Sequence, residues 1–537
     1  MSNRFATISL IIVVSIIGAC ILFVIGLFLF PGLYLFGIKY VGLNTHAVQT
    51  GKVEIYDKVG SFSGIVLNTY EVPVEVVFSG ENTYMLEYYD NYNGITSTDL
   101  GNPSIAYSKD DDGNAVISIT EYRTFIYESS TSTRYVKLYI PLHDVVNSGE
   151  YQKSIIINST KSSVKFCKAQ EGESRIPRLY SVELTTNGKV TYETEVKARK
   201  FAYTTNNSIL IDRENENCVN ATDSYTLISN RGSITVEKDT VGNLTAKTDQ
   251  GNILFRTCGH LNAETRYGKI DYAYLEGEEK GTKAVTINGL AKINARAGNV
   301  TIGEIKASSG QNEITTSSGH IVISKLRDGT VTTKRGLVNI KTARDLTVIS
   351  NTGKVYVEEA TAQLDVQTVR ANIYLGGDNM VMKDVTVFTR IGKVTMYSST
   401  GYANIETLSS DVTYSNISSS NIKIKCGGKL VATGLQGAVD ISAEKNVELS
   451  FASIDTNNVT IALGNGCSVA NISALNSLKD EVNYFMSGKK VFIQENQNNN
   501  AVTLEEKERY EVNADSSYMF KVTGANAVIT ICFKSSI

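Results

Sequence analysis

Proline and tryptophan are scarce in this chain of 537 residues, which contains 5 Pro and no Trp. Glycine and tyrosine are plentiful, with 42 Gly and 29 Tyr, and Thr, Ser, Val and Ile recur throughout. This mixture is typical of β-strands separated by tight turns. Because 42% of the residues are hydrophobic, the composition excludes a disordered chain.

The sequence also lacks any block of like charge. Its 52 basic and 55 acidic residues are spread along the chain and give a net charge of −3. We therefore predict no nucleic acid partner and no electrostatic attraction to an anionic membrane surface. The length exceeds that of one ordinary hydrophobic core and predicts two or three domains.

Motifs for catalysis and for cofactor or metal binding are missing. There is no G-x-S-x-G nucleophile elbow and no phosphate-binding G-x-x-x-x-G-K-[ST] motif. The segment Asp110 to Gly113 lacks the distal Glu of a calcium loop, so a hairpin turn is predicted there. The sequence thus predicts no enzyme, no catalytic residues, no cofactor and no metal site. The four histidines are far apart and form no H-E-x-x-H pattern: His46, His143, His260 and His320.

The seven cysteines form no C-x-x-C pair, which argues against a zinc site and against a small disulfide scaffold. Cys20 lies in an apolar N-terminal segment. We interpret the other six as small buried hydrophobic residues, and one or two disulfides stay open as an alternative in an exported protein. These six are Cys167, Cys218, Cys258, Cys426, Cys467 and Cys532.

A long apolar run follows the short N-terminal tail of residues 1–5. No charge occurs between Arg4 and Lys39, and the stretch from Ile8 to Phe30 is almost purely aliphatic and aromatic. A run of this length can cross the hydrocarbon core as a helix and exceeds the apolar core of a cleaved signal peptide. We predict an uncleaved signal anchor over residues 6–38 that inserts in the lipid bilayer, with the large C-terminal part outside the cytoplasm.

The centre of the chain carries an internal repeat. Its anchor positions are Gly188, Gly232, Gly251, Gly268, Gly298, Gly319, Gly336, Gly353, Ala371 and Gly392. Two residues after each anchor stands Val or Ile, and four residues after it stands another apolar or aromatic residue. Three residues before each anchor stands Thr, Ser or Ala. In the most regular part, neighbouring anchors are about 17 to 21 residues apart.

This pattern predicts two strands per repeat with a glycine corner between them. Positions +2 and +4 share one face of the second strand, and positions −5 and −3 share one face of the first. The glycine would supply a positive φ or a close backbone approach. One repeat cannot bury its apolar row alone, so stacking is required. We predict an all-β fold: a single-stranded parallel β-solenoid (β-helix) over residues 180–472, with about fifteen coils.

The segments around the repeats are predicted to cover its ends. Residues 39–52 would form a stalk, and residues 53–179 an irregular β cap made of hairpins. Residues 473–537 would form a C-terminal cap and hairpin. Leu475, Leu478, Val482 and Phe485 recur at helical spacing and predict one short helix within it.

The motif T-x-x-G-x-V-x-V resembles that of the adhesin family of bacterial surface β-solenoids. The matching stretches are TTNGKVTYE at 185–193, TTSSGHIVI at 315–323 and ISNTGKVYV at 349–357. The resemblance covers roughly residues 65 to 470. It implies a membrane-tethered surface protein without catalytic residues, and related solenoids are associated with envelope-stress systems.

We therefore expect a non-catalytic adhesion or binding protein at the cell surface, whose ligand is a surface protein or a glycan. A structural or envelope-stress signalling component is the first alternative. A polysaccharide-active β-helix enzyme is the second, although no acidic pair recurs at the one-coil spacing. Four tyrosines offer a ligand platform and could equally be hairpin core: Tyr84, Tyr88, Tyr89 and Tyr92.

Overall fold

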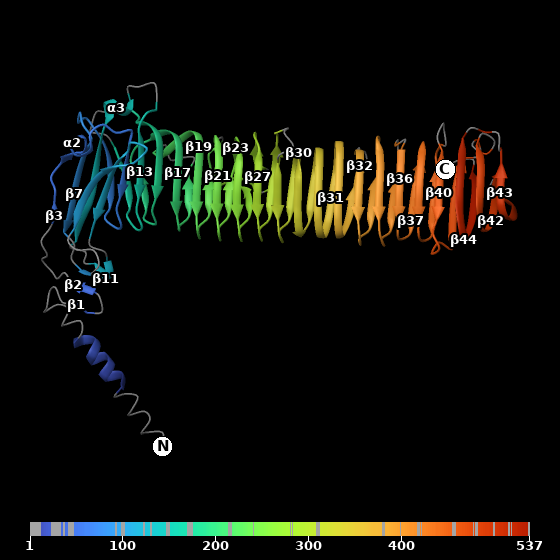
Figure 1. The fold of residues 1–537 in the computed structure, drawn as a ribbon, viewed down its shortest axis with the longest axis horizontal. Helices are drawn as coiled ribbons and strands as arrows, with labels where there is room; N and C mark the ends of the chain where they lie inside the picture. Colours follow the sequence, from blue (N-terminus) through green and yellow to red (C-terminus); the bar gives the residue numbers. More distant parts are fainter. Residues whose placement is uncertain are drawn as a thin grey trace, which may run out of the picture. The chain divides into compact units, whose positions relative to one another are not determined.

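The computed structural model describes residues 12–22, 34–35, 38–40 and most of 48–534 (Figure 1). The described chain forms two compact units, residues 1–230 and 231–537. The gaps within 48–534 are 92–93, 98–102, 122–123, 129–131, 147–150, 169–174, 213–216, 240, 280, 282, 308–311, 378–381, 398, 416–418, 420, 454–457, 476, 478, 480–481, 498–499, 514–515 and 517.

Of the predicted membrane anchor over 6–38, residues 12–22 form a helix with exposed apolar side chains. Residues 34–35 and 38 lie in strands, so the helix does not extend to the predicted end of the segment. The remaining residues of the anchor fall outside the described part of the chain. Within the described part, no helix has both the length and the apolar character needed to cross a bilayer.

The N-terminal unit is mostly β. Parallel pairings join β5 to β13, β13 to β15, β15 to β17 and β17 to β19. A second sheet has the order β16-β14-β6-β12-β7-β3 and mixes parallel and antiparallel pairs. Besides the helix at 12–22, it contains the short helices α2 (Ile55–Val59) and α3 (Leu142–Val146). Its strands are β1 (Tyr34–Leu35), β2 (Ile38–Tyr40), β3 (Val48–Gln49), β4 (Val53–Glu54), β5 (Gly64–Asn68), β6 (Val74–Ser79), β7 (Met85–Asn91), β8 (Gly94–Ser97), β9 (Ser104–Lys109), β10 (Ala115–Thr120), β11 (Thr124–Glu128), β12 (Thr133–Pro141), β13 (Ser154–Asn158), β14 (Val164–Cys167), β15 (Arg178–Thr185), β16 (Val190–Tyr192), β17 (Val196–Thr205), β18 (Ile209–Ile211) and β19 (Val219–Ser229).

From β20 to β41 the strands of the C-terminal unit pair in parallel with their counterparts in the next repeat (Figure 1, green to red). Its strands are β20 (Ile234–Val236), β21 (Asn243–Thr248), β22 (Ile253–Phe255), β23 (Thr257–Cys258), β24 (Leu261–Thr265), β25 (Ile270–Tyr272), β26 (Thr286–Ile287), β27 (Ala291–Ala295), β28 (Val300–Ile305), β29 (Glu313–Thr316), β30 (Ile321–Arg335), β31 (Val338–Leu375), β32 (Met382–Thr389), β33 (Val394–Tyr397), β34 (Tyr402–Thr407), β35 (Val412–Ser415), β36 (Asn421–Cys426), β37 (Leu430–Leu435), β38 (Ala438–Ala443), β39 (Val447–Phe451), β40 (Val459–Leu463), β41 (Val469–Leu475), β42 (Asn483–Gln497), β43 (Asn500–Val512) and β44 (Met519–Lys534).

The predicted register of the repeat is confirmed within this unit. The +2 residues lie opposite one another in consecutive ladders: Ile253 pairs with Ile270, Ile270 with Val300, Val300 with Ile321, and Ile321 with Val338. All five of these side chains are buried. An unbroken apolar row therefore runs across successive strands, as stacking of half-buried strands requires.

Close backbone packing explains the glycines of the corners. A Cβ added to Gly298 would overlap the carbonyl oxygen of Gly268, and one added to Gly319 would overlap that of Gly298. The same overlap recurs at Gly336 and Gly353, which also have positive φ angles of 147° and 128°. Close backbone approach therefore requires glycine at all four of these corners, and a positive φ is a second reason at two of them.

The buried threonines at position −3 hold these corners together. Thr265 Oγ1 donates to the Gly251 carbonyl of the preceding repeat at 3.0 Å and accepts from Gly268 N, also at 3.0 Å. Thr248 makes the equivalent pair of bonds with Gly232 and Gly251. At these two corners the hydroxyl satisfies a donor and an acceptor that close packing removes from water, which explains the preference for threonine at a position that Ala295 also fills before Gly298.

The predicted C-terminal cap helix is wrong. Leu475 ends β41, Phe485 lies within β42, and Leu478 falls outside the described residues. Val482 and Tyr484 are buried with Met486, so the burial has the period of two that is typical of a strand. In place of a helix, β42 pairs antiparallel with β43 and parallel with β44.

A negative charge should destabilise the protein on the buried side of a strand and be tolerated on the exposed side. Ile321→Asp places a carboxylate in the buried row and should lower the free energy of unfolding by more than about 3 kcal/mol. His320→Asp changes an exposed side chain that accepts from Leu337 N at 3.0 Å, a role that a carboxylate can keep. Thermal unfolding followed by circular dichroism compares the two variants, and equal melting temperatures would refute the register.

Candidate functional site

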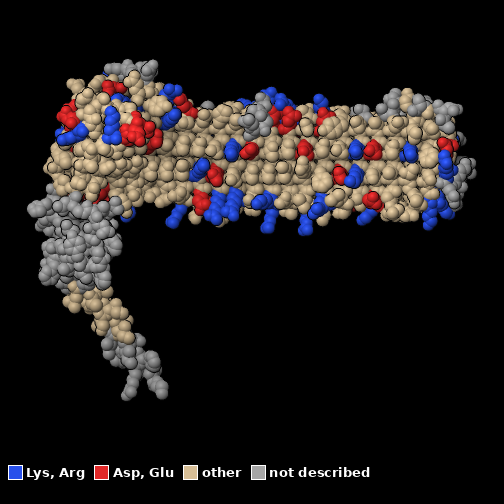
Figure 2. Space-filling view, viewed as in Figure 1, with Lys and Arg blue, Asp and Glu red and all other residues tan. Residues whose placement is uncertain are grey.

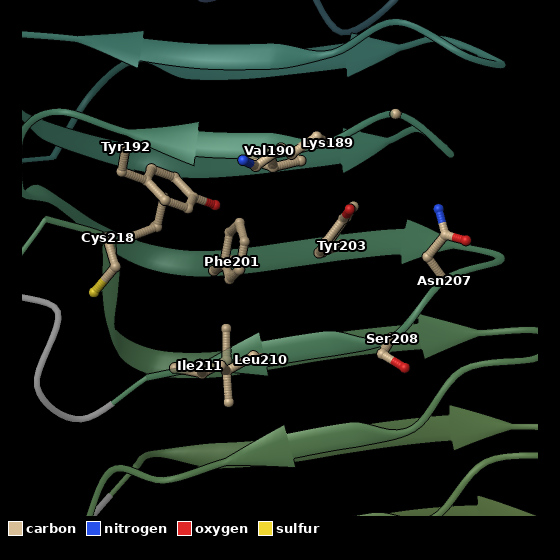
Figure 3. A pocket seen from close by; sticks show the side chains of 12 residues that line it. Lys189, Val190, Tyr192, Phe201, Tyr203, Asn207, Ser208, Leu210, Ile211 and Cys218 are labelled. Atoms are coloured by element: carbon tan, nitrogen blue, oxygen red, sulfur yellow. The ribbon is translucent and has the colours of Figure 1, made fainter.

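A cavity of about 410 Å³ opens in the N-terminal unit beside the edge strand β16 (Figure 3). β16 pairs with β14, with Val190 opposite Val164 and Tyr192 opposite Phe166. The volume of the cavity falls within the range of small-ligand sites, about 300 to 1,000 Å³. The residues around it are Gly188, Lys189, Val190, Tyr192, Phe201, Tyr203, Asn207, Ser208, Leu210, Ile211, Cys218 and Val219.

Aromatic rings form the floor of this cavity. Tyr192 occupies the +4 position of the first predicted repeat and stacks on Phe166 with ring centroids 5.2 Å apart. The ring centroid of Phe201 lies 6.5 Å from that of Tyr203 and 6.1 Å from that of Tyr225, which Phe201 meets edge to face. The rings are positioned by strands β16, β17 and β19, so the floor is set by the same inward alternation that builds the core.

Polar groups complete the cavity, and apart from Lys189 they are uncharged. Burial raises the pKa of Tyr192 and of Tyr203 above the ordinary tyrosine value, so both hydroxyls stay protonated at neutral pH. Asn207 is fixed by its amide, which donates to Asn187 O at 2.7 Å. Cys218 Sγ lies 3.6 Å from Asn220 Oδ1. This set of groups suits non-covalent binding of a group with an apolar face and a polar edge.

The four tyrosines of the predicted ligand platform differ in their burial and contacts. Tyr88 is fully buried and donates to Asp90 at 2.7 Å, and Tyr84 is buried and donates to Asp144 at 3.1 Å. Tyr89 is half-buried and stacks on Tyr135. Tyr92 lies outside the described residues. The two buried rings belong to the core of the unit, which is the second interpretation of these tyrosines.

The N-terminal unit also contains a buried cluster of charged residues around Arg134, which the sequence analysis does not predict. Arg134 Nε lies 2.9 Å from Asp90 Oδ1, and its Nη atoms lie 3.3 Å from Glu71 and 3.4 Å from Glu121. Glu121 also accepts from the backbone of residues 70–72 and from Thr69 Oγ1. The four charged residues are separated in sequence by up to 63 positions, and only the pairing of the strands brings them together.

The remaining sequence-predicted groups are scattered. All seven cysteines are free, so the disulfide alternative is wrong in this structure. Cys218, Cys258, Cys426 and Cys467 are buried, as expected for small hydrophobic residues, whereas Cys167 and Cys532 are half-buried. His143, His260 and His320 are exposed, and His46 lies outside the described residues. In the described part of the chain, no three His, Cys, Asp or Glu side chains converge as metal ligands would.

Comparisons with known proteins identify no relative. No family model matches the chain, and neither a curated protein nor a solved structure resembles it significantly. The resemblance to bacterial adhesins therefore rests on the motif alone.

Removing Arg134 tests the role of the charge cluster. Arg134→Met removes the counter-charge of the buried Asp90 and Glu121, while Glu71 keeps Lys161 at 4.0 Å, and should destabilise the N-terminal unit by about 3 to 5 kcal/mol. Arg178→Met, at an exposed position, is the matched control and should change stability by less than about 0.5 kcal/mol. Chemical denaturation measures both. A similar midpoint for the two variants would show that the cluster contributes nothing to stability.

Proposed function

We propose that the chain is a non-catalytic binding protein that presents a rigid β-solenoid of about fifteen coils at the cell surface. The observation that carries this proposal is the continuous inward packing of the repeat. Because the inward residues of each strand are committed to the core, the outward residues of successive strands form one extended surface for a partner. A surface protein or a glycan is the partner that this surface suits.

The aromatic cavity supports binding rather than catalysis. Its lining is mostly apolar side chains, hydroxyls and the Asn207 amide, joined by the Cys218 thiol and the Lys189 ammonium, and such a set can orient a ligand. Leu210 stands at the cavity with 57% of its surface exposed, although it is a large apolar residue. An apolar group of a partner would remove this side chain from water, and that is the favourable contribution expected of a contact site.

The proposal places the body outside the cytoplasm, tethered by the N-terminal apolar segment. The helix at 12–22 supports a tether, because its apolar side chains are exposed, from 51% at Val13 to 71% at Leu22. Contact with lipid hydrocarbon would remove that surface from water. The uncharged sequence from Ile8 to Phe30 has the length that such a tether needs.

Protease treatment of intact cells tests this placement. The body should be cleaved from intact cells at the same rate as from lysed cells, while a cytoplasmic marker stays whole. Full protection of the body from the protease in intact cells would refute the surface-binding proposal, because a body enclosed with the marker cannot reach an external partner.

A substitution at the cavity tests the binding site. Leu210→Glu removes the exposed apolar contact without disturbing the core and should reduce attachment of cells that carry the chain by about tenfold. Val469→Glu changes another exposed apolar residue, 38% accessible, and should leave attachment unchanged. Unchanged attachment with both variants would exclude the cavity as the site and favour a structural role in the envelope.

A further inference from the structure

Basic side chains line the glycine corners of the C-terminal unit. They occupy one or two of positions −2, −1 and +1 in five of the six consecutive repeats from Gly298 to Gly392, the Gly319 repeat being the exception, and these positions contain no Asp or Glu. All seven are exposed. We call this set the basic edge, and Figure 2 shows Lys and Arg side chains following one long edge of this unit. Its members are Arg296, Lys334, Arg335, Lys354, Arg370, Arg390 and Lys393.

Backbone hydrogen bonds place the corners on consecutive rungs. Ser317 N donates to Arg296 O at 3.0 Å, and Arg335 N donates to Ser317 O at 2.9 Å. Further along, Ile391 N donates to Val369 O at 2.8 Å. Each rung advances by about 4.8 Å, so the five steps from the first to the last corner give a row about 24 Å long. A spacing of roughly 20 residues in sequence thus becomes one row of positive charge, with a single uncharged rung at Gly319.

The cations of the basic edge have no counter-charge within the described chain, whereas several other cations of the unit are paired. Within the described chain, none of the seven side chains has a carboxylate within 4.0 Å. Elsewhere Lys269 lies 2.9 Å from Asp271, and Arg344 lies 2.7 Å from Asp328. Uncompensated like charges in a row produce a positive potential that attracts a polyanion.

The surroundings of the row favour one kind of polyanion. Val369 and Ile391, exposed by 41% and 47%, stand between the cations and suit the C–H faces of sugar rings. A single-stranded nucleic acid stacks successive bases on open aromatic faces, whereas beside this row Tyr356 and Tyr374 stack on each other with centroids 4.7 Å apart and Phe388, 39% exposed, offers a face at the last repeat. A duplex turns its phosphates away from a straight row within about 17 Å, half a helical turn.

A flat anionic membrane fits the edge less well than a chain does. The strand faces next to the basic edge carry Glu313, Asp365 and Glu358, none of which is buried. A plane of lipid headgroups resting on the edge would meet these carboxylates, whereas a chain one residue wide would not. We propose that the basic edge binds a linear acidic glycan, one whose carboxylate or sulfate groups repeat along an extended chain. This inference rests on the proposed surface function and names the ligand class.

The test measures binding of the full-length chain, in non-ionic detergent, to immobilised heparin, a sulfated glycan, and to polygalacturonate, a carboxylated one. Neutral dextran is the blank. The chain should bind at least one acidic glycan, with affinity falling as salt rises. A variant that neutralises four cations of the edge should bind about tenfold more weakly and with a shallower salt dependence. This variant carries Lys334→Gln, Lys354→Gln, Arg370→Gln and Arg390→Gln.

A control variant removes the same charge from other exposed positions of this unit and should keep wild-type affinity. It carries Lys292→Gln, Lys341→Gln, Lys383→Gln and Lys423→Gln. Equal losses in both variants, no binding beyond dextran, or tighter binding of duplex DNA or anionic vesicles would overturn the glycan assignment. Because the assay uses purified protein, its failure leaves the proposed surface function intact. Protection from protease in intact cells would instead refute that function even if glycans bind.

Discussion

The close approach of one glycine corner to the next is the constraint on which the repeat depends. At the glycine corners the carbonyl of one corner occupies the space where the next would place a Cβ, as at Gly268 and Gly298, and Ala371 is the one corner of the series that holds a Cβ. This contact brings strands of successive repeats within hydrogen-bonding distance, and the ladders then stack the apolar rows. The threonine hydroxyls complete the corner by pairing the backbone groups that packing hides from water.

The same constraint separates what the core needs from what a partner can contact. Positions −3, +2 and +4 are fixed by packing, whereas −2, −1 and +1 lie outside the corner and are free to differ between repeats. Those free positions carry the basic edge. In the N-terminal unit, β16 forms the edge of its sheet, and the aromatic cavity lies beside it. The basic edge and the aromatic cavity are therefore both additions to one repeating scaffold.

Periodicity made the repeats predictable from sequence, because Ile253, Ile270 and Val300 hold equivalent places in consecutive units. Helical spacing of four apolar residues between Leu475 and Phe485 wrongly predicts a helix, because the alternating burial of Val482, Tyr484 and Met486 is the pattern of a strand. The Arg134 cluster and the basic edge had no local signature. Their members are far apart in sequence, and only strand pairing makes them neighbours.

One measurement tests the glycine-corner account most directly, namely the thermal stability of two Gly→Ala variants. In Gly298→Ala the new methyl group meets the Gly268 carbonyl oxygen, whereas in Gly377→Ala no atom lies within 4 Å of the new Cβ. The account predicts that Gly298→Ala lowers the free energy of unfolding by about 2 kcal/mol or more, with Gly377→Ala close to wild type. Equal stability of the two variants would contradict it, because the corners would then have room for a side chain.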